Sequence, residues 1–137
     1  MIAITRKDFS IDEVIRSMKT RENGAIVSFL GIVRGETEGA IVERLEVQAY
    51  EEMALRQLED IRKEAYQKFD VNQISIIHRR GVLDVTENIV LIAVGSAHRD
   101  DAFKACRFVL EELKAKVPLW KKEFTSEGGF WRGEPTK

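Results

Sequence analysis

The sequence is poor in cysteine and proline, with a single Cys106 and two prolines among 137 residues. One cysteine excludes an internal disulfide, and few prolines argue against a disordered or fibrous chain. Long apolar runs are also missing, because the longest, IVLIAVG, ends at Ser96 and falls short of the roughly 18 residues that a membrane-spanning helix requires. The opening residues, MIAITRKDFS, lack the basic and then apolar order of a secretory signal. We therefore expect a cytoplasmic protein that does not span a membrane.

An excess of charge of one sign is missing as well. The 22 Lys and Arg residues balance 23 Asp and Glu residues, which leaves a formal net charge of -1. No field of the whole protein therefore attracts nucleic acid or an anionic membrane, and any anion site must be local. With 44% hydrophobic and 33% charged residues, the chain length fits one folded domain over residues 1–137.

Motifs that indicate nucleotide or metal chemistry are absent. The sequence contains no GxxxxGKS or GxxxxGKT loop, no GxGxxG and no GxSxG pattern. The two histidines and the cysteine are widely separated and match no zinc pattern, so we expect neither a metal nor a cofactor. Cys106 falls on an apolar helical stripe and is expected to be a packed thiol. His78, in IIHRR, has no cysteine or carboxylate at metal-ligand spacing.

Apolar spacing and capping residues predict helices over residues 11–19 and 51–69. Ser10 followed by Glu13 has the order of a capping box, in which each side chain satisfies a free amide at the helix start. In the second segment an apolar side chain recurs every three or four residues, which predicts one buried stripe and the longest helix of the chain.

A third helix is expected before Pro118, which disfavours helix at the residue preceding it. Asp100 or Asp101 can cap its start. The segment 120–124 is then predicted to be extended, and a Gly-Gly turn is expected at residues 128 and 129. The apolar stripe of the third helix is predicted to consist of Phe103, Cys106, Leu110, Leu113 and Val117.

Strands are predicted at residues 25–33, 41–50, 74–79 and 88–98. The first is rich in β-branched and aromatic residues, as in a well-buried strand, whereas the second alternates apolar and polar residues. GETEG, at 35–39, has no period and is expected to be a mobile surface loop. Strands that mix with helices without strict alternation predict an α+β domain, with a mixed, largely antiparallel sheet and helices packed on one face.

The stretch LKAKVPLWKKE places Lys114, Lys116, Lys121 and Lys122 on both sides of Pro118. A change of backbone direction at the proline can bring these cations together, and Lys114 lies at the edge of the apolar stripe, as a pocket residue would. Two close ammonium groups disfavour each other's charge, so one of them can act as a nucleophile or base. The alternative is a solvated cluster that interacts with the dipole of the helix C-terminus.

Other candidate binding residues lie at the ends of strands. His98 and Arg99, in SAHRDD, precede a helix whose free amides could help them bind a phosphate or carboxylate. A histidine at a strand end is more often a hydrogen-bonded structural residue, which is the alternative for His98. Arg34 leaves a buried strand and either reaches an anion or is solvated. Phe29 could stack on a flat ligand, but core packing is the usual role of such a residue.

Several segments together resemble one family, the large catalytic subunit of molybdopterin synthase. They are GAIVSFLGIVR, YEEMA, IIHRRG, SAHRDDAFKACRFVLEELKAKVPLWKKE and the later Trp131, over about residues 23–131. The resemblance implies a hammerhead-like α/β domain and a sulfurtransferase of molybdenum cofactor biosynthesis. In this family a small ubiquitin-like partner, ending in a Gly-Gly thiocarboxylate, gives sulfur to cyclic pyranopterin monophosphate to form the dithiolene of molybdopterin. The large subunits form a homodimer within a heterotetramer.

The resemblance also implies roles for particular residues. Lys114 and Lys121 match the family's two essential lysines, and Phe29 matches an aromatic residue near the partner's tail. Arg34, His98 and Arg99 match its anion-binding group, the latter two reaching across the dimer. The rival hypothesis is a non-catalytic module that holds single-stranded nucleic acid on its basic turn and aromatic side chains.

Overall fold

The structure is a computed structural model that describes residues 1–132, with side chains described through Gly129. The side chain of Trp131, which belongs to the family resemblance, lies outside the described residues. In chain order the elements are β1 (Ile2–Thr5), α1 (Ile11–Ser17), β2 (Ala25–Ile32), β3 (Glu36–Thr37), β4 (Ala40–Ala49), α2 (Glu51–Lys68), β5 (Gln73–Arg79), β6 (Gly81–Asp84), β7 (Asn88–Ser96), α3 (Arg99–Lys116), β8 (Leu119–Thr125) and β9 (Gly128–Arg132).

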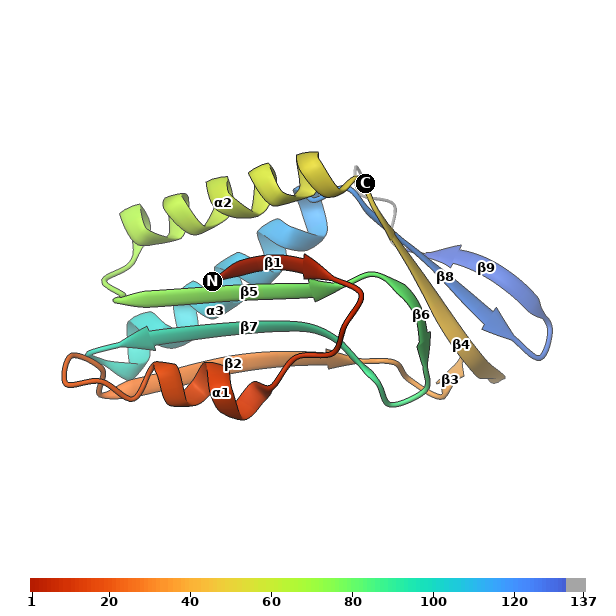
Figure 1. The fold of residues 1–137 in the computed structure, drawn as a ribbon, viewed down its shortest axis with the longest axis horizontal. Coiled ribbons are helices and arrows are strands. Elements are labelled where there is room, and N and C mark those ends of the chain that lie inside the picture. The colour runs from red at the N-terminus through yellow and green to blue at the C-terminus, as the bar shows by residue number, and fades with distance from the viewer. Residues whose placement is uncertain (133–137) are drawn as a thin grey trace.

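The strands form two sheets that lie next to each other along the long axis of the molecule (Figure 1). In the first sheet, of order β1-β5-β7-β2, β1 and β5 are parallel and the other neighbours are antiparallel. In the second, β4 pairs antiparallel with β3, β6 and β8, and β8 pairs antiparallel with β9. The predicted α+β class with a mixed, largely antiparallel sheet is confirmed.

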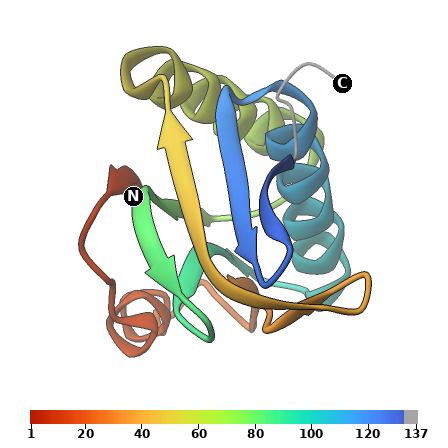
Figure 2. The ribbon, with the colours of Figure 1, turned by 90° about the vertical axis from the view of Figure 1, so that its right-hand side faces the viewer.

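The two long helices cover one face of the first sheet, whereas α1 lies on the opposite face (Figures 1 and 2). α2 was predicted to be the longest helix, but α2 and α3 are equally long, with 18 residues each. The cap of α1 is confirmed, because Ser10 Oγ accepts a hydrogen bond of 3.2 Å from the backbone N–H of Glu13. Among residues 1–132, no helix is both long and apolar enough to cross a bilayer.

The start and the buried face of α3 differ from the prediction. His98, not Asp100 or Asp101, occupies the N-cap position, without a side-chain capping hydrogen bond. Phe103 is 62% exposed and therefore does not belong to the buried stripe. The same helical periodicity is also met by the adjacent row of residues, which includes Ala102 and Ala105. Their small side chains let α3 pack closely against the sheet. The buried residues of α3 are Ala102, Ala105, Cys106, Val109 and Leu113, so the packed thiol is confirmed.

The expected loop at GETEG is instead a short hairpin between β3 and β4. Glu36 pairs with Ile41, and Thr37 pairs with Ala40. Glu38 and Gly39 form the turn with positive φ angles of 46° and 81°. Two successive positive φ angles are typical of the tight turns that match the twist of a β-hairpin. The lack of hydrophobic periodicity in this segment therefore did not mean a mobile loop, because its turn has a defined geometry.

The prediction of a turn at Gly128 and Gly129 is also wrong. The chain turns at Ser126 and Glu127, and both glycines belong to β9. A Cβ atom on Gly129 would lie 2.8 Å from the side chain of Lys122, so this glycine permits close packing of β9 on β8. Two further strands were not predicted. β1 is too short to show a period, and β6 lies in the stretch after Arg80 whose form the sequence left open.

The core is centred on β7, which is buried from Ile89 to Ser96. This strand has neighbours on both sides and α3 against one face, so a nearly continuous apolar run replaces alternation. Leu58 of α2 is fully buried in the same core. The packed sheet provides the rigid support on which the residues of the cavity described below are held.

Replacing Leu58 with alanine should lower the free energy of unfolding by about 2–5 kcal/mol, because it removes buried methyl groups and leaves a cavity. Arg56→Ala is the matched control, since it shortens an exposed side chain on the same helix and should change stability by less than about 0.5 kcal/mol. Urea unfolding followed by circular dichroism measures both. Equal stability of the two variants would contradict the assigned core.

Candidate active site

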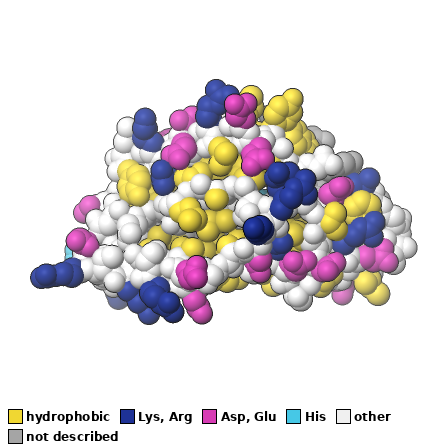
Figure 3. All heavy atoms as spheres, viewed as in Figure 1, with side chains coloured by type: hydrophobic (Ala, Val, Ile, Leu, Met, Phe, Trp, Pro, Cys, Tyr) yellow, Lys and Arg dark blue, Asp and Glu magenta, His cyan; other side chains and the backbone are white. Residues whose placement is uncertain are grey.

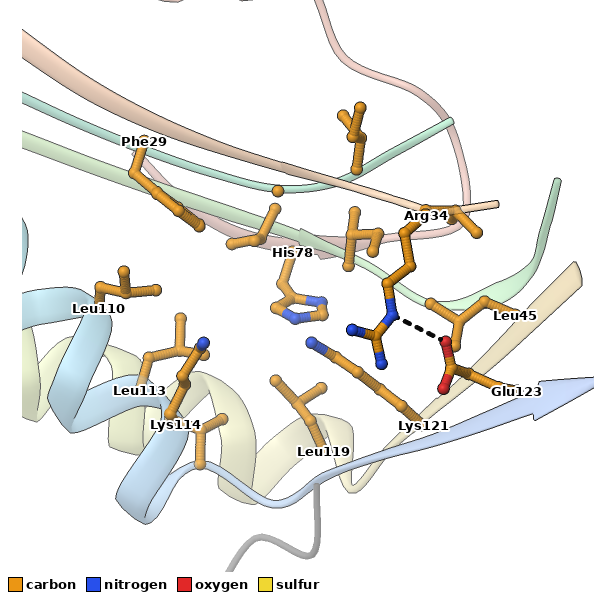
Figure 4. Close-up of a pocket in the computed structure, with 16 residues that line it drawn as sticks. Phe29, Arg34, Leu45, His78, Leu110, Leu113, Lys114, Leu119, Lys121 and Glu123 are labelled. Carbon is orange, nitrogen blue, oxygen red and sulfur yellow. Dashed lines mark hydrogen bonds and ion pairs between the residues drawn. The ribbon is translucent and has the colours of Figure 1, made fainter. Parts of the chain in front are cut away.

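A cavity of about 460 Å³ lies where the end of β5, the segment after β2, the last turns of α3 and the start of β8 meet (Figure 4). Apolar side chains form most of its wall, among them those of Phe29, Leu110 and Leu113. Its polar side chains are Arg34, His78, Lys114, Lys121 and Glu123. The cavity therefore combines an apolar wall with three cations, a histidine and one carboxylate.

The end of α3 explains why Lys114 and Lys121 meet. α3 stops at Lys116, and after Pro118 the chain reverses into β8, which runs antiparallel to β4. Lys114 then approaches from the helix and Lys121 from the strand, and both amines point towards the space beside His78 (Figure 4). The predicted convergence of these two lysines is observed, with Lys121 half-buried and Lys114 exposed at the mouth.

The other two lysines of the cluster point elsewhere. Lys116 forms an ion pair with Glu112, one turn earlier on the exposed side of α3, at 2.6 Å. Lys122 faces the opposite side of β8, with its amine 5.2 Å from the centre of the Phe124 ring. Alternation along the strand separates Lys122 from Lys121, so only half of the basic cluster belongs to the cavity.

The environment of Lys121 lowers its pKa below the ordinary value for lysine. Burial is the larger cause, because it disfavours the charged ammonium, and the positive charge of Lys114 adds to it. A neutral amine is therefore available at Lys121 at a lower pH than on an exposed lysine. Such an amine can accept a proton or attack an electrophile.

Arg34 is held in place by two side chains. Its Nε donates to Glu123 Oε2 at 3.3 Å, and its Nη2 donates to Thr37 Oγ1 at 2.8 Å. The Glu123 side chain is 7% exposed and that of Arg34 is 59% exposed, so a buried carboxylate orients a largely exposed guanidinium. Thr37 comes from the hairpin that was expected to be a loop. Glu123 was missed as a site residue, although strand alternation places it on the same face as Lys121.

His78 was given little weight from the sequence, yet its ring lies in the wall of the cavity. The residue is fully buried, and Nδ1 lies 2.8 Å from the carbonyl oxygen of Arg79. Burial, followed by the charge of Lys121, lowers the pKa of His78 to about 4. The imidazole is therefore neutral near pH 7. No sequence signal pointed to it, since a histidine in a buried strand is usually a structural residue.

Phe29 lies on β2 and lines the cavity on the side away from Arg34 (Figure 4). On the same strand Gly31 makes room for the Val90 side chain, from which a Cβ atom there would lie only 2.9 Å away, whereas the Phe29 ring would remain at an ordinary contact distance of 3.5 Å. Phe29 therefore contributes to the cavity wall rather than lying wholly within the core.

His98 and Arg99 lie at the other end of α3. They border a shallow depression with Gly24, Ala25 and neighbouring residues. Arg99 and Lys114 are separated by most of the helix, which at 1.5 Å per residue is roughly 22 Å. One copy of the chain therefore does not bring His98 and Arg99 to the cavity. Their predicted role requires a second copy.

The cavity is chemically suited to anions. Ammonium and guanidinium groups form strong, charge-assisted hydrogen bonds with carboxylate, thiocarboxylate and phosphate oxygens. Within residues 1–132, no group of three His, Cys, Asp or Glu side chains is placed to hold a metal ion.

The family model for the MoaE protein matches residues 4–116. The chain belongs to the MoaE family. The molybdopterin synthase catalytic subunit of Pyrococcus abyssi is 46% identical over 125 residues, which cover 91% of this chain and 84% of that protein. The protein of the same name from Homo sapiens is 39% identical, covering 97% and 71% of the two chains.

Solved structures of MoaE family members have the same fold. Molybdopterin synthase from Staphylococcus aureus superposes with a TM-score of 0.90 at 37% identity, covering 96% of each chain. The MoaE protein from Burkholderia ambifaria gives a TM-score of 0.84 at 33% identity, covering 100% of this chain and 91% of that one. A complex of subunits 1 and 2 of molybdopterin-converting factor from Helicobacter pylori contains a chain of the same fold, with 19% identity, a TM-score of 0.79 and coverage of 98% and 92%.

Replacing Lys114 with glutamine should raise the pKa of Lys121, because removing a nearby positive charge favours the ammonium form. The pKa should remain below the ordinary value, since burial, the larger cause, is unchanged. Lys116→Gln is the matched control on the same helix, as Lys116 pairs with Glu112 away from the cavity. An NMR titration of the Lys121 side chain measures the shift. An unchanged Lys121 pKa in the Lys114 variant would contradict the proximity of the two amines.

Proposed function

We propose that this chain is the catalytic subunit of a molybdopterin synthase, a sulfurtransferase of molybdenum cofactor biosynthesis. A small ubiquitin-like partner ending in a Gly-Gly thiocarboxylate delivers sulfur to cyclic pyranopterin monophosphate, and two sulfurs build the dithiolene. The observation that carries the proposal is the convergence of Lys114, Lys121 and Arg34 on one cavity in a member of the MoaE family. The names of its relatives support the same activity.

The charge distribution supports a reaction between anions. A thiocarboxylate and a phosphate are both negative, so they repel each other unless cations surround the place where they meet. Transition-state charge is stabilised most effectively by groups fixed in a site from which water is largely excluded. Elsewhere acidic and basic side chains are interspersed, as the face in Figure 3 shows, in agreement with the net charge of -1.

The cavity allows distinct tasks for its cations. Lys114, at the mouth, binds the thiocarboxylate and stabilises the oxyanion that forms as the acyl carbon reacts. Lys121, whose pKa is lowered by burial and by Lys114, moves a proton or holds the pterin. Arg34 binds an anionic substrate group while Glu123 and Thr37 fix its orientation.

The apolar wall supports entry of the partner's tail. Glycine lacks a side chain and permits close backbone approach, so a Gly-Gly terminus suits a narrow passage beside Phe29, Leu110 and Leu113. The related Helicobacter pylori protein is a complex of two subunits, which agrees with a small partner here. In the proposed homodimer within a heterotetramer, His98 and Arg99 of a second copy complete the anion site.

The proposal includes one domain over residues 1–137 and a cytoplasmic location, as the length and composition led us to expect. The rival, a module that holds single-stranded nucleic acid, is disfavoured. Such modules track the nucleic-acid backbone along an open basic groove, whereas here two of the four clustered lysines face a cavity and the net charge is -1.

Mixing the purified protein with a thiocarboxylated, Gly-Gly-tailed partner and cyclic pyranopterin monophosphate should yield the dithiolene product, detected by mass spectrometry. A partner ending in an ordinary carboxylate is the control and should give none. Formation of a stable complex without product would overturn the proposed activity. Tight, steeply salt-dependent binding of oligonucleotides without affinity for the partner would favour the rival.

Lys114→Ala and Lys121→Ala should each reduce product formation by at least about 100-fold, because each removes a group that acts on the reacting atoms. Circular dichroism and partner binding should remain close to those of the unmodified protein. Lys116→Ala, on the exposed side of α3, should retain nearly full activity. Near-normal rates in both cavity variants would refute the assigned roles.

A further inference from the structure

His78 is a hydrogen-bond acceptor in a cavity whose other polar groups are mainly donors. The Arg79 carbonyl oxygen can only accept, so the hydrogen bond of 2.8 Å places the imidazole proton on Nδ1. In the neutral ring Nε2 therefore carries a lone pair. Nε2 is buried and has no hydrogen-bond partner among the described residues. A buried polar atom of this kind calls for an explanation, since nearly all such atoms are paired.

The backbone fixes the place of the ring. His78 lies near the end of β5, paired with Ile4 of β1 on one side and with Val90 of β7 on the other. The bond from Nδ1 to the Arg79 carbonyl oxygen restrains rotation of the ring. Nε2 is thereby held at the cavity wall, on the side where Lys121 extends (Figure 4).

We propose that His78 is a positioning residue for Lys121, whose Nζ donates a hydrogen bond to His78 Nε2 once the flexible lysine side chain rotates towards the ring. The bond orients the amine into the cavity and gives Nε2 the partner it lacks. A neutral amine that donates one N–H to His78 presents its own lone pair to a substrate. The catalytic importance of this contact rests on the proposed function, whereas the contact itself does not.

The charges around the ring keep His78 an acceptor. Lys121 and Glu123 approach from β8, Lys114 from α3 and Arg34 from the segment after β2, whereas the strand neighbours Ile4 and Val90 are apolar. Burial disfavours an imidazolium most, and the positive charge of Lys121 acts in the same direction. With a pKa of about 4, His78 stays neutral, and its Nε2 lone pair persists, throughout the range in which enzymes usually work.

The first test compares His78→Leu, which removes the acceptor at similar volume, with His78→Gln, whose amide oxygen can replace it. NMR titration of Lys121 in the protein alone should show a lower pKa in the leucine variant, because the ammonium loses an acceptor in the same buried place. The glutamine variant should restore much of the difference. Ile76→Val, a conservative change on the same strand, should leave the Lys121 pKa unchanged.

A second measurement uses chains in which His78 itself is intact, so it remains informative if the leucine variant does not fold. Lys121→Met should move the ¹⁵N resonance of His78 Nε2 towards that of an acceptor without a donor. Lys114→Gln removes a charge but not the donor and should leave that hydrogen bond in place. A purely structural histidine would show no selective response to Lys121.

Activity separates this inference from the proposed function. In the complete synthase, His78→Leu should lower kcat by up to about 100-fold, as expected when a reacting group is misplaced. The acidic limb of the pH–rate profile of His78→Leu should shift to lower pH, because the Lys121 pKa is lower. His78→Gln should recover part of the rate. If Lys121 responds as stated but no variant or parent protein makes product, the proposed function fails and the contact stands. If product forms and neither the Lys121 pKa nor the Nε2 resonance responds, the inference is overturned.

Discussion

The site depends on holding like charges together in a recess partly removed from water. Lys121 is half-buried beside Lys114, and Arg34 faces the same cavity. Burial and mutual repulsion both act against this arrangement, and the lowered pKa of Lys121 is their direct consequence. Glu123 offsets part of the repulsion through its ion pair with Arg34. A bound anion offsets the rest, so the mutual repulsion of these cations favours binding of an anionic substrate.

The fold supplies the stability that such a site needs. β7 is buried along nearly its whole length between β5 and β2, and α2 and α3 pack against that sheet. The cavity lies at the boundary of the two sheets, where α3 ends and β8 begins. Because Pro118 breaks the helix there, one short segment places a helical lysine and a strand lysine in the same space. Residues seven positions apart along the chain are thereby brought to the same cavity.

The rest of the site shows how neutral and apolar groups direct the cations. Glu123 and Thr37 orient Arg34, while His78 offers a neutral acceptor beside Lys121. Apolar side chains such as Phe29 limit the access of water, which strengthens the electrostatic interactions inside. Membership in the MoaE family agrees with this combination of a cationic cavity and an apolar approach. His98 and Arg99 lie at the far end of α3, so their proposed part in the anion site would require a second copy of the chain.

The α+β class, the capped α1 and the two long helices could be predicted from the sequence, because these follow from local periodicity and residue type. The lysine cluster could be recognised there as well, but spacing left open whether it lines a cavity or a solvated surface. The sequence could not show which of the four lysines face a common cavity, since that depends on the reversal after Pro118 and on the pairing of β8 with β4. Tertiary structure alone decided that Phe103 is exposed, that GETEG is a hairpin and that Thr37 contacts Arg34. It alone also placed His78 next to Lys121, because contacts between distant segments are set by packing and leave no pattern in the neighbouring residues.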